Sequence, residues 1–235
     1  METHYISRTS DCWLKVQLVG GLVVSLPYGL KVKRLELKNE REYFEILEGV
    51  NKGKKASVPF LAGNSYLTTK LNHNPATTVR FDRKLQTLYF AGRGPCNAFS
   101  GGGHGGYTPV APGNYQLAIP AYPSAQTRAA YNTWTKYHNS WFRIGTDTTG
   151  SRFLHAGVIS EGCVTVRQFI YDPNSGVAPP PAGFSDLVQG AKTVPGLLGL
   201  PLPAKPAPVV GWDDVFESLI LCRLNDQAIG TLVVT

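Results

Sequence analysis

Short runs in which apolar and polar residues alternate constrain this chain most. One run covers residues 14–18, and a longer one covers residues 30–37. Turn-forming residues, such as the Gly20-Gly21 pair, separate such runs. Successive side chains of a β-strand point to opposite faces, so a period of two indicates half-buried strands and argues against helices. The sequence therefore predicts a mainly β fold.

The composition is that of a globular protein, and its net charge is compatible with an anionic partner or surface. Of the 235 residues, 43% are hydrophobic and 17% charged, which is enough apolar material for one or two ordinary cores. The net charge of +7 favours either an anionic partner or solubility alone. Lys52, Lys54 and Lys55 form the tightest basic group, so no nucleic-acid partner is expected.

The turn signals divide the chain into two predicted domains. Residues 1–70 read as a small β domain of short, turn-separated strands, a pattern that resembles a bacterial SH3-like domain. Polar turn residues over 62–76 would form the linker. Residues 77–235 form the second domain, in which the proline-rich stretch 173–208 is predicted to be an extended insertion.

The second domain is predicted to hold strands and one or two short helices. Helix spacing of apolar residues, with Asp213 and Asp214 in the first turn, favours a helix over 211–223. A further helix is expected over 121–137, where Pro123 limits its start. The expected strands cover residues 78–82, 86–91, 115–119, 141–144, 152–155 and 230–235.

Metal and cofactor sites are not indicated by the cysteines or by the glycine-rich segment. Four widely spaced cysteines contain no C-x-x-C pair, so free thiols are the first expectation, and a Cys12–Cys222 disulfide stays open. The glycine-rich stretch 92–107 lacks the Gly-Lys-Ser/Thr ending of a phosphate loop. The N-terminus does not look like a secretory signal, and no apolar run reaches transmembrane length.

The densest chemistry lies between residues 153 and 167. His155 precedes Cys163 by eight residues, and Gly162 stands directly before the cysteine. An imidazole that accepts the proton of a thiol turns it into a nucleophile. A glycine allows the backbone to approach a substrate carbonyl. A lone cysteine beside valines is otherwise a small core residue, so this pattern needs support from the rest of the chain.

That support is a resemblance to L,D-transpeptidases of the YkuD type. The run Ser160-x-Gly-Cys163-Val-x-Val166 resembles the cysteine motif of that family. A compact branch, which includes peptidoglycan-cleaving secretion-system effectors, is similar at Ala98-Phe-Ser-Gly101 and Pro112-Gly-Asn-Tyr115. The strand at 141–144 and the closing strand at 230–234 also fit, so the resemblance covers 77–235.

Two positions inside the motif depart from the family. Many members carry a histidine where this chain has Glu161, and an arginine where it has Thr165. The spacing from His155 to Cys163 is also shorter than in most members and fits the compact branch. These departures bear on substrate binding more than on the two reacting groups.

The resemblance implies a β-sandwich or barrel that carries a catalytic cysteine. Cys163 would be the nucleophile and His155 its base, oriented by the carbonyl of Ala156. The N–H groups of Gly162 and Cys163 would stabilise the oxyanion, while Ser160 would hydrogen-bond the thiolate or shape the turn. The thiolate would attack the third residue of a peptidoglycan stem peptide. Water would then complete L,D-carboxypeptidase activity, and an amine would complete transpeptidation.

Substrate carboxylates call for cations. Arg167, Arg143 and Arg93 are candidates, since arginine binds carboxylates through two parallel hydrogen bonds. Thr165, His104 and Ser100 complete the predicted substrate-binding residues. A surface role is the competing interpretation for each arginine, and a solvated loop position is the competing one for His104.

Two alternatives stay open. One is a non-catalytic cell-wall-binding protein, and the other is a cysteine peptidase of the NlpC/P60 type, in which the cysteine usually starts a helix upstream of the histidine. The expected partner is the peptidoglycan stem peptide. Whether the chain also has an immunity or secretion partner stays open. Such a substrate implies action in the periplasm or cell envelope, and both export by a dedicated system and release by lysis stay open as routes.

Overall fold

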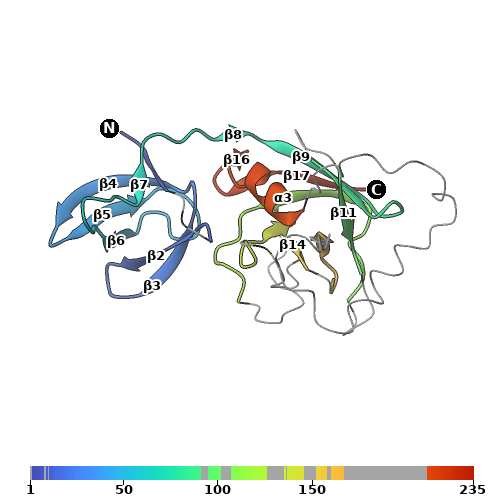
Figure 1. Cartoon of the computed structure of the whole chain (residues 1–235), viewed down its shortest axis with the longest axis horizontal. Helices are drawn as coiled ribbons and strands as arrows, with labels where there is room; N and C mark the ends of the chain where they lie inside the picture. Colours follow the sequence, from blue (N-terminus) through green and yellow to red (C-terminus); the bar gives the residue numbers. More distant parts are fainter. Residues whose placement is uncertain are drawn as a thin grey trace, which may run out of the picture. The chain divides into compact units, whose positions relative to one another are not determined.

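The computed structural model describes residues 2–7, 9, 11–90, 95–101, 107–125, 135, 137–145, 152–157, 160–166 and 211–235 (Figure 1). These residues form a curled β-sheet and a closed β-barrel, with a single helix among them. The mainly β prediction is confirmed. The prolines of 173–208 lie outside the described residues.

The N-terminal sheet contains seven strands in the order β3-β2-β6-β5-β4-β1-β7. They are β1 (His4–Ile6), β2 (Trp13–Leu18), β3 (Val23–Pro27), β4 (Lys31–Lys38), β5 (Arg41–Ile46), β6 (Lys55–Pro59) and β7 (Leu67–Thr68). In β2 the side chains of Leu14, Val16 and Leu18 are buried while Lys15 and Gln17 are exposed, which is the predicted alternation. The buried side chains of these strands form a hydrophobic cluster of their own.

Tight turns set the register of this sheet. Asn39 and Glu40 between β4 and β5 both have positive φ, at 51° and 55°. Two successive residues with positive φ make the turn whose twist matches that of a β-hairpin. The Gly20-Gly21 pair does the same between β2 and β3, with φ values of 106° and 93°. The turn signals of the sequence therefore act as hairpin turns.

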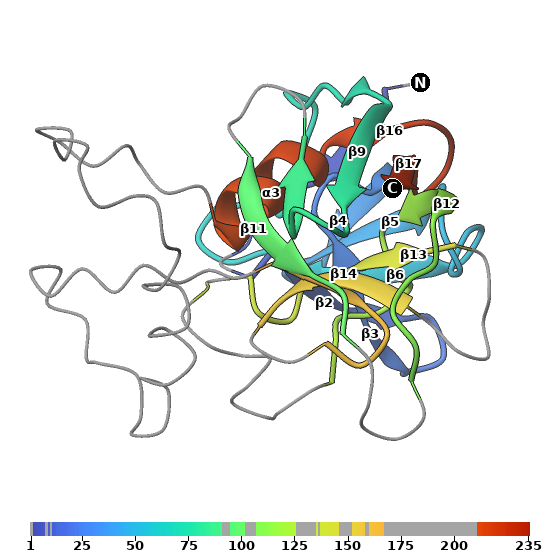
Figure 2. The same cartoon turned by 90° about the vertical axis from the view of Figure 1, so that its right-hand side faces the viewer.

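The barrel closes through eight strands in the order β10-β11-β15-β14-β13-β12-β17-β9 (Figure 2). They are β9 (Thr77–Asp82), β10 (Thr87–Tyr89), β11 (Cys96–Phe99), β12 (Gly113–Ala118), β13 (Phe142–Ile144), β14 (Arg152–Ala156), β15 (Val164–Val166) and β17 (Ala228–Val234). Only β14/β15 and β17/β9 pair in parallel, and the six other contacts are antiparallel. Two further short strands, β8 (Asn74–Pro75) and β16 (Cys222–Arg223), pair with each other.

Helix α3 (Trp212–Leu219) packs its apolar face into the barrel's hydrophobic cluster. Trp212, Val215, Phe216 and Leu219 are buried, at the helical spacing that the sequence predicts. The backbone N–H of Gly211 donates to the Asp214 carboxylate at 3.1 Å, which satisfies one free donor of the first turn. The helix predicted over 211–223 is therefore confirmed in its core and ends four residues earlier.

The helix predicted over 121–137 is not found in the described part of that range. Residues 121–125 are irregular, as are 135 and 137, and the rest lies outside the described residues. Pro120 and Pro123 lack backbone N–H donors, and the N–H of Ser124 donates to the Asn139 carbonyl at 2.8 Å. This long-range hydrogen bond replaces the first helical turn.

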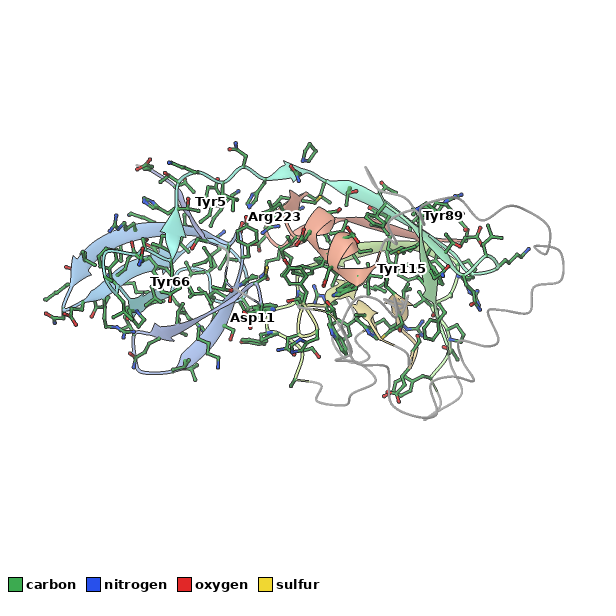
Figure 3. The ribbon with its side chains drawn as sticks, in the orientation of Figure 1. Tyr5, Asp11, Tyr66, Tyr89, Tyr115 and Arg223 are labelled. Carbon is green, nitrogen blue, oxygen red and sulfur yellow. The ribbon has the colours of Figure 1, made fainter. Side chains whose placement is uncertain are left out.

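The Pro112-Gly-Asn-Tyr115 stretch is built as the start of β12. The Tyr115 hydroxyl, labelled in Figure 3, donates to the Ala111 carbonyl at 2.9 Å. A Cβ on Gly113 would lie 3.5 Å from the Tyr115 ring, and the φ of this glycine is +154°. The tyrosine therefore closes over the bend, which gives this motif a structural role.

We predict that Gly230→Ala is among the most destabilising single changes in the barrel. The glycine has φ +155°, and a Cβ there would lie 1.9 Å from the backbone oxygen of Thr77 on β9. The parallel pair β17/β9 would have to separate, so we expect a loss of about 4 kcal/mol or more in the free energy of unfolding. Denaturant titration followed by tryptophan fluorescence measures it.

Gly53→Ala is the matched control. Its φ is +80° with no atom within 4 Å of the added Cβ, so only the left-handed backbone cost of about 1–2 kcal/mol applies. Equal losses in the two variants would contradict the close approach of β17 to β9.

Candidate active site

The predicted reacting residues lie on, or directly before, two neighbouring parallel strands. His155 is in β14 and pairs with Thr165 in β15, while Cys163 directly precedes β15. Leu154 and Val164, which also pair, point into the hydrophobic cluster. Because side chains alternate along a strand, His155, Cys163 and Thr165 point to the opposite face. The fold thus brings the histidine and the cysteine to one face of one strand pair.

The imidazole of His155 is held on two sides. Its Nδ1 lies 2.7 Å from the carbonyl oxygen of Ala156. Its ring stacks on Trp141 with 4.4 Å between ring centroids and 21° between planes. The Trp141 Nε1–H in turn donates to the His138 carbonyl at 2.9 Å. The contact expected between the imidazole and the Ala156 carbonyl is therefore present, and an aromatic side chain adds a second restraint.

This contact determines the proton positions on the ring. A carbonyl only accepts, so Nδ1 carries the hydrogen and Nε2 of the neutral ring is the acceptor. Burial lowers the pKa of His155 to about 4, and the side chain is fully shielded from solvent. The imidazole is therefore neutral at physiological pH, and Nε2 is its acceptor nitrogen.

Thr165 occupies a different position from the one predicted. Its side chain is fully buried, and its hydroxyl lies 3.2 Å from Nε2 of His155. It therefore contacts the candidate base and does not present a surface to substrate. The register of β14 against β15 causes this, because it pairs the two residues directly.

Cys163 is nearly buried, with 8% of its surface exposed. Burial raises the pKa of its thiol, while the Phe153 N–H, which lies 3.4 Å from Sγ, and the Arg152 charge act in the opposite direction. The net direction is upward, so the thiol is protonated at neutral pH. The site therefore rests as a neutral thiol and a neutral imidazole.

The loop before the cysteine is fixed by its backbone. The N–H of Gly162 donates to the carbonyl of Gly101 at 2.9 Å, so the predicted oxyanion role of this N–H is not available in this conformation. The Ser160 hydroxyl donates to the Cys163 carbonyl at 2.7 Å. Of the two roles foreseen for Ser160, the turn-shaping one is therefore observed.

Gly162 is required for this loop. Its φ is +76°, and an added Cβ would lie 3.0 Å from the Thr108 carbonyl oxygen. Gly101 faces the same loop, since a Cβ on it would lie 3.1 Å from the Ser160 carbonyl oxygen. The Phe-Ser-Gly segment and the Gly-Cys segment are therefore in direct contact through two glycines.

Arg152 is a site residue that the sequence reasoning missed. Its guanidinium donates to the Pro109 carbonyl at 3.1 Å and to the Thr108 hydroxyl at 3.2 Å. It thereby holds the 108–109 segment against Gly162, and its charge favours the thiolate form of Cys163. In the sequence, the signal for a role of Arg152 was its position at the start of the expected strand that carries His155.

The predicted substrate-binding residues fall in different places. Arg143 lies on β13 next to β14, where it pairs with Phe153. Ser100 accepts a hydrogen bond from the Val110 N–H at 2.8 Å and lines a pocket of about 380 Å³ with Arg83 and Lys84. Neither Cys163 nor His155 is among the described residues that line this pocket. Arg167, His104 and Arg93 lie outside the described residues.

No protein-family model, curated protein or solved structure matches this chain. Within the described ranges, no three or more histidine, cysteine or acidic side chains are grouped so that they could hold a metal ion. All four cysteines are free thiols. No helix in the described part of the chain is both long and apolar enough to cross a membrane.

We predict that Thr165→Val changes the Nε2 resonance of His155 in ¹⁵N NMR spectra, while Thr165→Ser leaves it unchanged. Valine matches the shape of threonine but removes the hydroxyl that contacts Nε2. The signal of His155 is assigned by its loss in His155→Gln. A Thr165→Val spectrum identical to that of the wild type would show that the hydroxyl does not bind the ring.

We also predict that alkylation of Cys163 by iodoacetamide is slow at pH 7 and accelerates as the pH rises through and beyond the ordinary thiol range. Burial raises the thiol pKa, so the reactive thiolate forms only at higher pH. Peptide mapping by mass spectrometry quantifies labelling at Cys163 separately from the three other cysteines. A rate plateau between about pH 5 and 7 would instead reveal a thiolate–imidazolium pair.

Proposed function

We propose that this chain is a cysteine-dependent peptidoglycan L,D-transpeptidase or L,D-carboxypeptidase with a YkuD-like catalytic barrel. The observation that carries the proposal is the imidazole of His155, held by the Ala156 carbonyl with its basic nitrogen on the same strand-pair face as Cys163. The family motif around Cys163 supplies the substrate class. An SH3-like N-terminal domain that binds the cell wall, and action in the cell envelope, belong to the same proposal.

In the proposed reaction Nε2 of His155 accepts the thiol proton as the sulfur attacks the carbonyl carbon of the third stem-peptide residue. The C–S bond forms, and the C–N bond to the terminal D-amino acid then breaks. The imidazolium returns the proton to the leaving amine, so the atoms and charges balance. Water or an amine then attacks the thioester and releases the thiol.

The resting geometry supports a general-base start. Because Nδ1–H is held by the Ala156 carbonyl, only Nε2 can accept a proton. The Thr165 hydroxyl donates to Nε2 in the resting state and, since a hydroxyl also accepts, can accept from Nε2–H once the ring is protonated. Nε2 has a single lone pair, so in the proposed reaction this hydroxyl must turn away from Nε2 before the thiol proton is transferred.

A non-catalytic wall-binding protein remains the second candidate. The full burial of His155 and the occupation of its Nε2 by Thr165 are also what a packing histidine would show. The NlpC/P60 alternative is less well supported, because Cys163 follows the histidine in the chain and precedes a strand.

We predict that Cys163→Ala and His155→Ala each reduce release of D-alanine from muropeptide tetrapeptides by on the order of a thousandfold or more. Each variant removes one of the two groups between which the proton must pass. Mass spectrometry of the products measures the reaction and shows whether water or an amine is the acceptor. Circular dichroism checks that the variants fold.

Cys222→Ala is the matched control, since this cysteine is also buried but lies on β16 and not on the β14/β15 pair. It should keep its activity. Full activity in Cys163→Ala or His155→Ala would refute the catalytic proposal, and a wild-type chain that binds sacculi without releasing D-alanine would favour the wall-binding candidate.

A further inference from the structure

Two turns of the N-terminal sheet expose aliphatic side chains. The turn between β2 and β3 carries Val19, Leu22 and Val23, whose exposed fractions are 73%, 63% and 60%. The turn between β5 and β6 adds Val50, at 57%. Exposed apolar side chains are ordinary when they are scattered singly, whereas a group of them marks an interaction surface. We call these four residues the aliphatic tip.

Strand pairing brings the two turns together. Leu18 of β2 pairs with Ala56 of β6, and the Val19 N–H donates to the Lys55 carbonyl at 2.9 Å. The hairpin of β2 and β3 therefore ends beside Lys55, the first residue of β6 (Figure 1). Leu18 and Ala56 are buried, so Val19 and Lys55, one residue further along each strand, both point to the outer face.

The turn between β2 and β3 is firmly built and stands clear of its surroundings. The Leu18 N–H donates to the Leu22 carbonyl at 2.8 Å, and the Gly21 N–H donates to the Leu18 carbonyl at 3.0 Å. A Cβ added to Gly20 or Gly21 would meet no atom of the described residues within 4 Å, and the same holds for Gly53 in the second turn. Both turns therefore present their side chains to whatever approaches this end of the sheet.

The tightest basic group of the chain lies next to the aliphatic tip. Lys52, Lys54 and Lys55 are all exposed. The Lys54 ammonium donates to the Asn51 side-chain oxygen at 3.0 Å, which uses one of its three donors. Glu45 lies opposite Lys55 on β5 and offsets one positive charge. The group therefore keeps an excess of positive charge beside the aliphatic side chains.

This combination matches the two layers of an anionic lipid surface. Aliphatic side chains gain free energy by entering the boundary between headgroups and acyl chains, and lysines are attracted to anionic headgroups. The long alkyl stem of a lysine lies along apolar surface while its ammonium stays among polar groups. A nucleic acid or another anionic polymer would engage the lysines but would leave the aliphatic tip in water. The aliphatic tip therefore favours a membrane over such polymers.

We propose that the N-terminal sheet docks on anionic membranes, with the aliphatic tip at the acyl boundary and Lys52, Lys54 and Lys55 at the lipid phosphates. This docking goes beyond the proposed catalysis and does not depend on it. It is peripheral and reversible, because only a few side chains enter the lipid. It would hold the chain at the surface of a membrane while the barrel stays outside the lipid.

Vesicle flotation with the full-length chain tests this surface. The vesicles contain phosphatidylcholine, with or without phosphatidylglycerol. We expect roughly hundredfold tighter binding to the anionic vesicles, because each lysine near such a surface contributes about fivefold. Val19→Ser/Leu22→Ser should weaken this binding about tenfold or more, since both side chains lose their apolar burial. Lys52→Gln/Lys54→Gln/Lys55→Gln should lower it to the level of the neutral vesicles.

Two matched variants control for the number of side chains changed. Leu35→Ser/Leu37→Ser removes two exposed aliphatic side chains from β4, away from the turn between β2 and β3. Lys38→Gln/Lys70→Gln/Lys84→Gln removes three exposed lysines elsewhere in the chain. Both should bind the anionic vesicles nearly as tightly as the wild type. Circular dichroism checks that all variants fold.

The outcomes are distinct. Binding that falls in the two test variants and persists in the two controls supports the proposal, whether or not the chain proves to be catalytic. Absence of vesicle binding, equal binding to both kinds of vesicle, or equal losses in test and control variants would overturn it. Unchanged binding by Val19→Ser/Leu22→Ser also overturns it, because the lysines would then act alone, as they would toward any anionic polymer.

Discussion

The parallel pairing of β14 with β15 is the contact on which the candidate site depends. Its register sets His155 opposite Thr165 and places Leu154 and Val164 together in the hydrophobic cluster. A slip of one residue would turn the imidazole into that cluster and the leucine out of it. The burial of these apolar side chains therefore fixes the orientation of the polar ones, and the closed barrel leaves neither strand at an edge.

Features that depend on local sequence could be predicted. The alternation of apolar and polar residues over 14–18 correctly predicted strand β2, because successive side chains of a strand point to its buried and exposed faces in turn. Apolar spacing from Trp212 gave α3. The hydrogen bond from His155 to Ala156 was also predictable, since the two residues are adjacent in the chain. The start of the helix expected over 121–137 is irregular at 121–125, where the N–H of Ser124 bonds to Asn139, a contact that no local pattern reveals.

The rest of the site depends on contacts between distant segments. The N–H of Gly162 is bound by Gly101, and the guanidinium of Arg152 holds the segment at Thr108. Neither hydrogen bond follows from the residue types alone, because a backbone N–H or a guanidinium can bond to acceptors in many other parts of the chain. The role of Thr165 shows the same limit. The resemblance to L,D-transpeptidases led us to expect a substrate contact at Thr165, whereas the strand register makes this residue a partner of the histidine.

A buried, neutral thiol and imidazole restrict how the proposed reaction can begin. Transfer of the proton before attack would leave two opposite charges in a site shielded from water, and the cost of removing charges from solvent opposes this. If the proton moves to Nε2 while sulfur attacks the carbonyl, the negative charge passes on to the substrate oxygen instead. The charge of Arg152, which favours the thiolate form of Cys163, also acts on this developing negative charge. In the proposed mechanism the reactivity of Cys163 therefore depends more on the bound substrate than on a thiolate formed before the substrate binds.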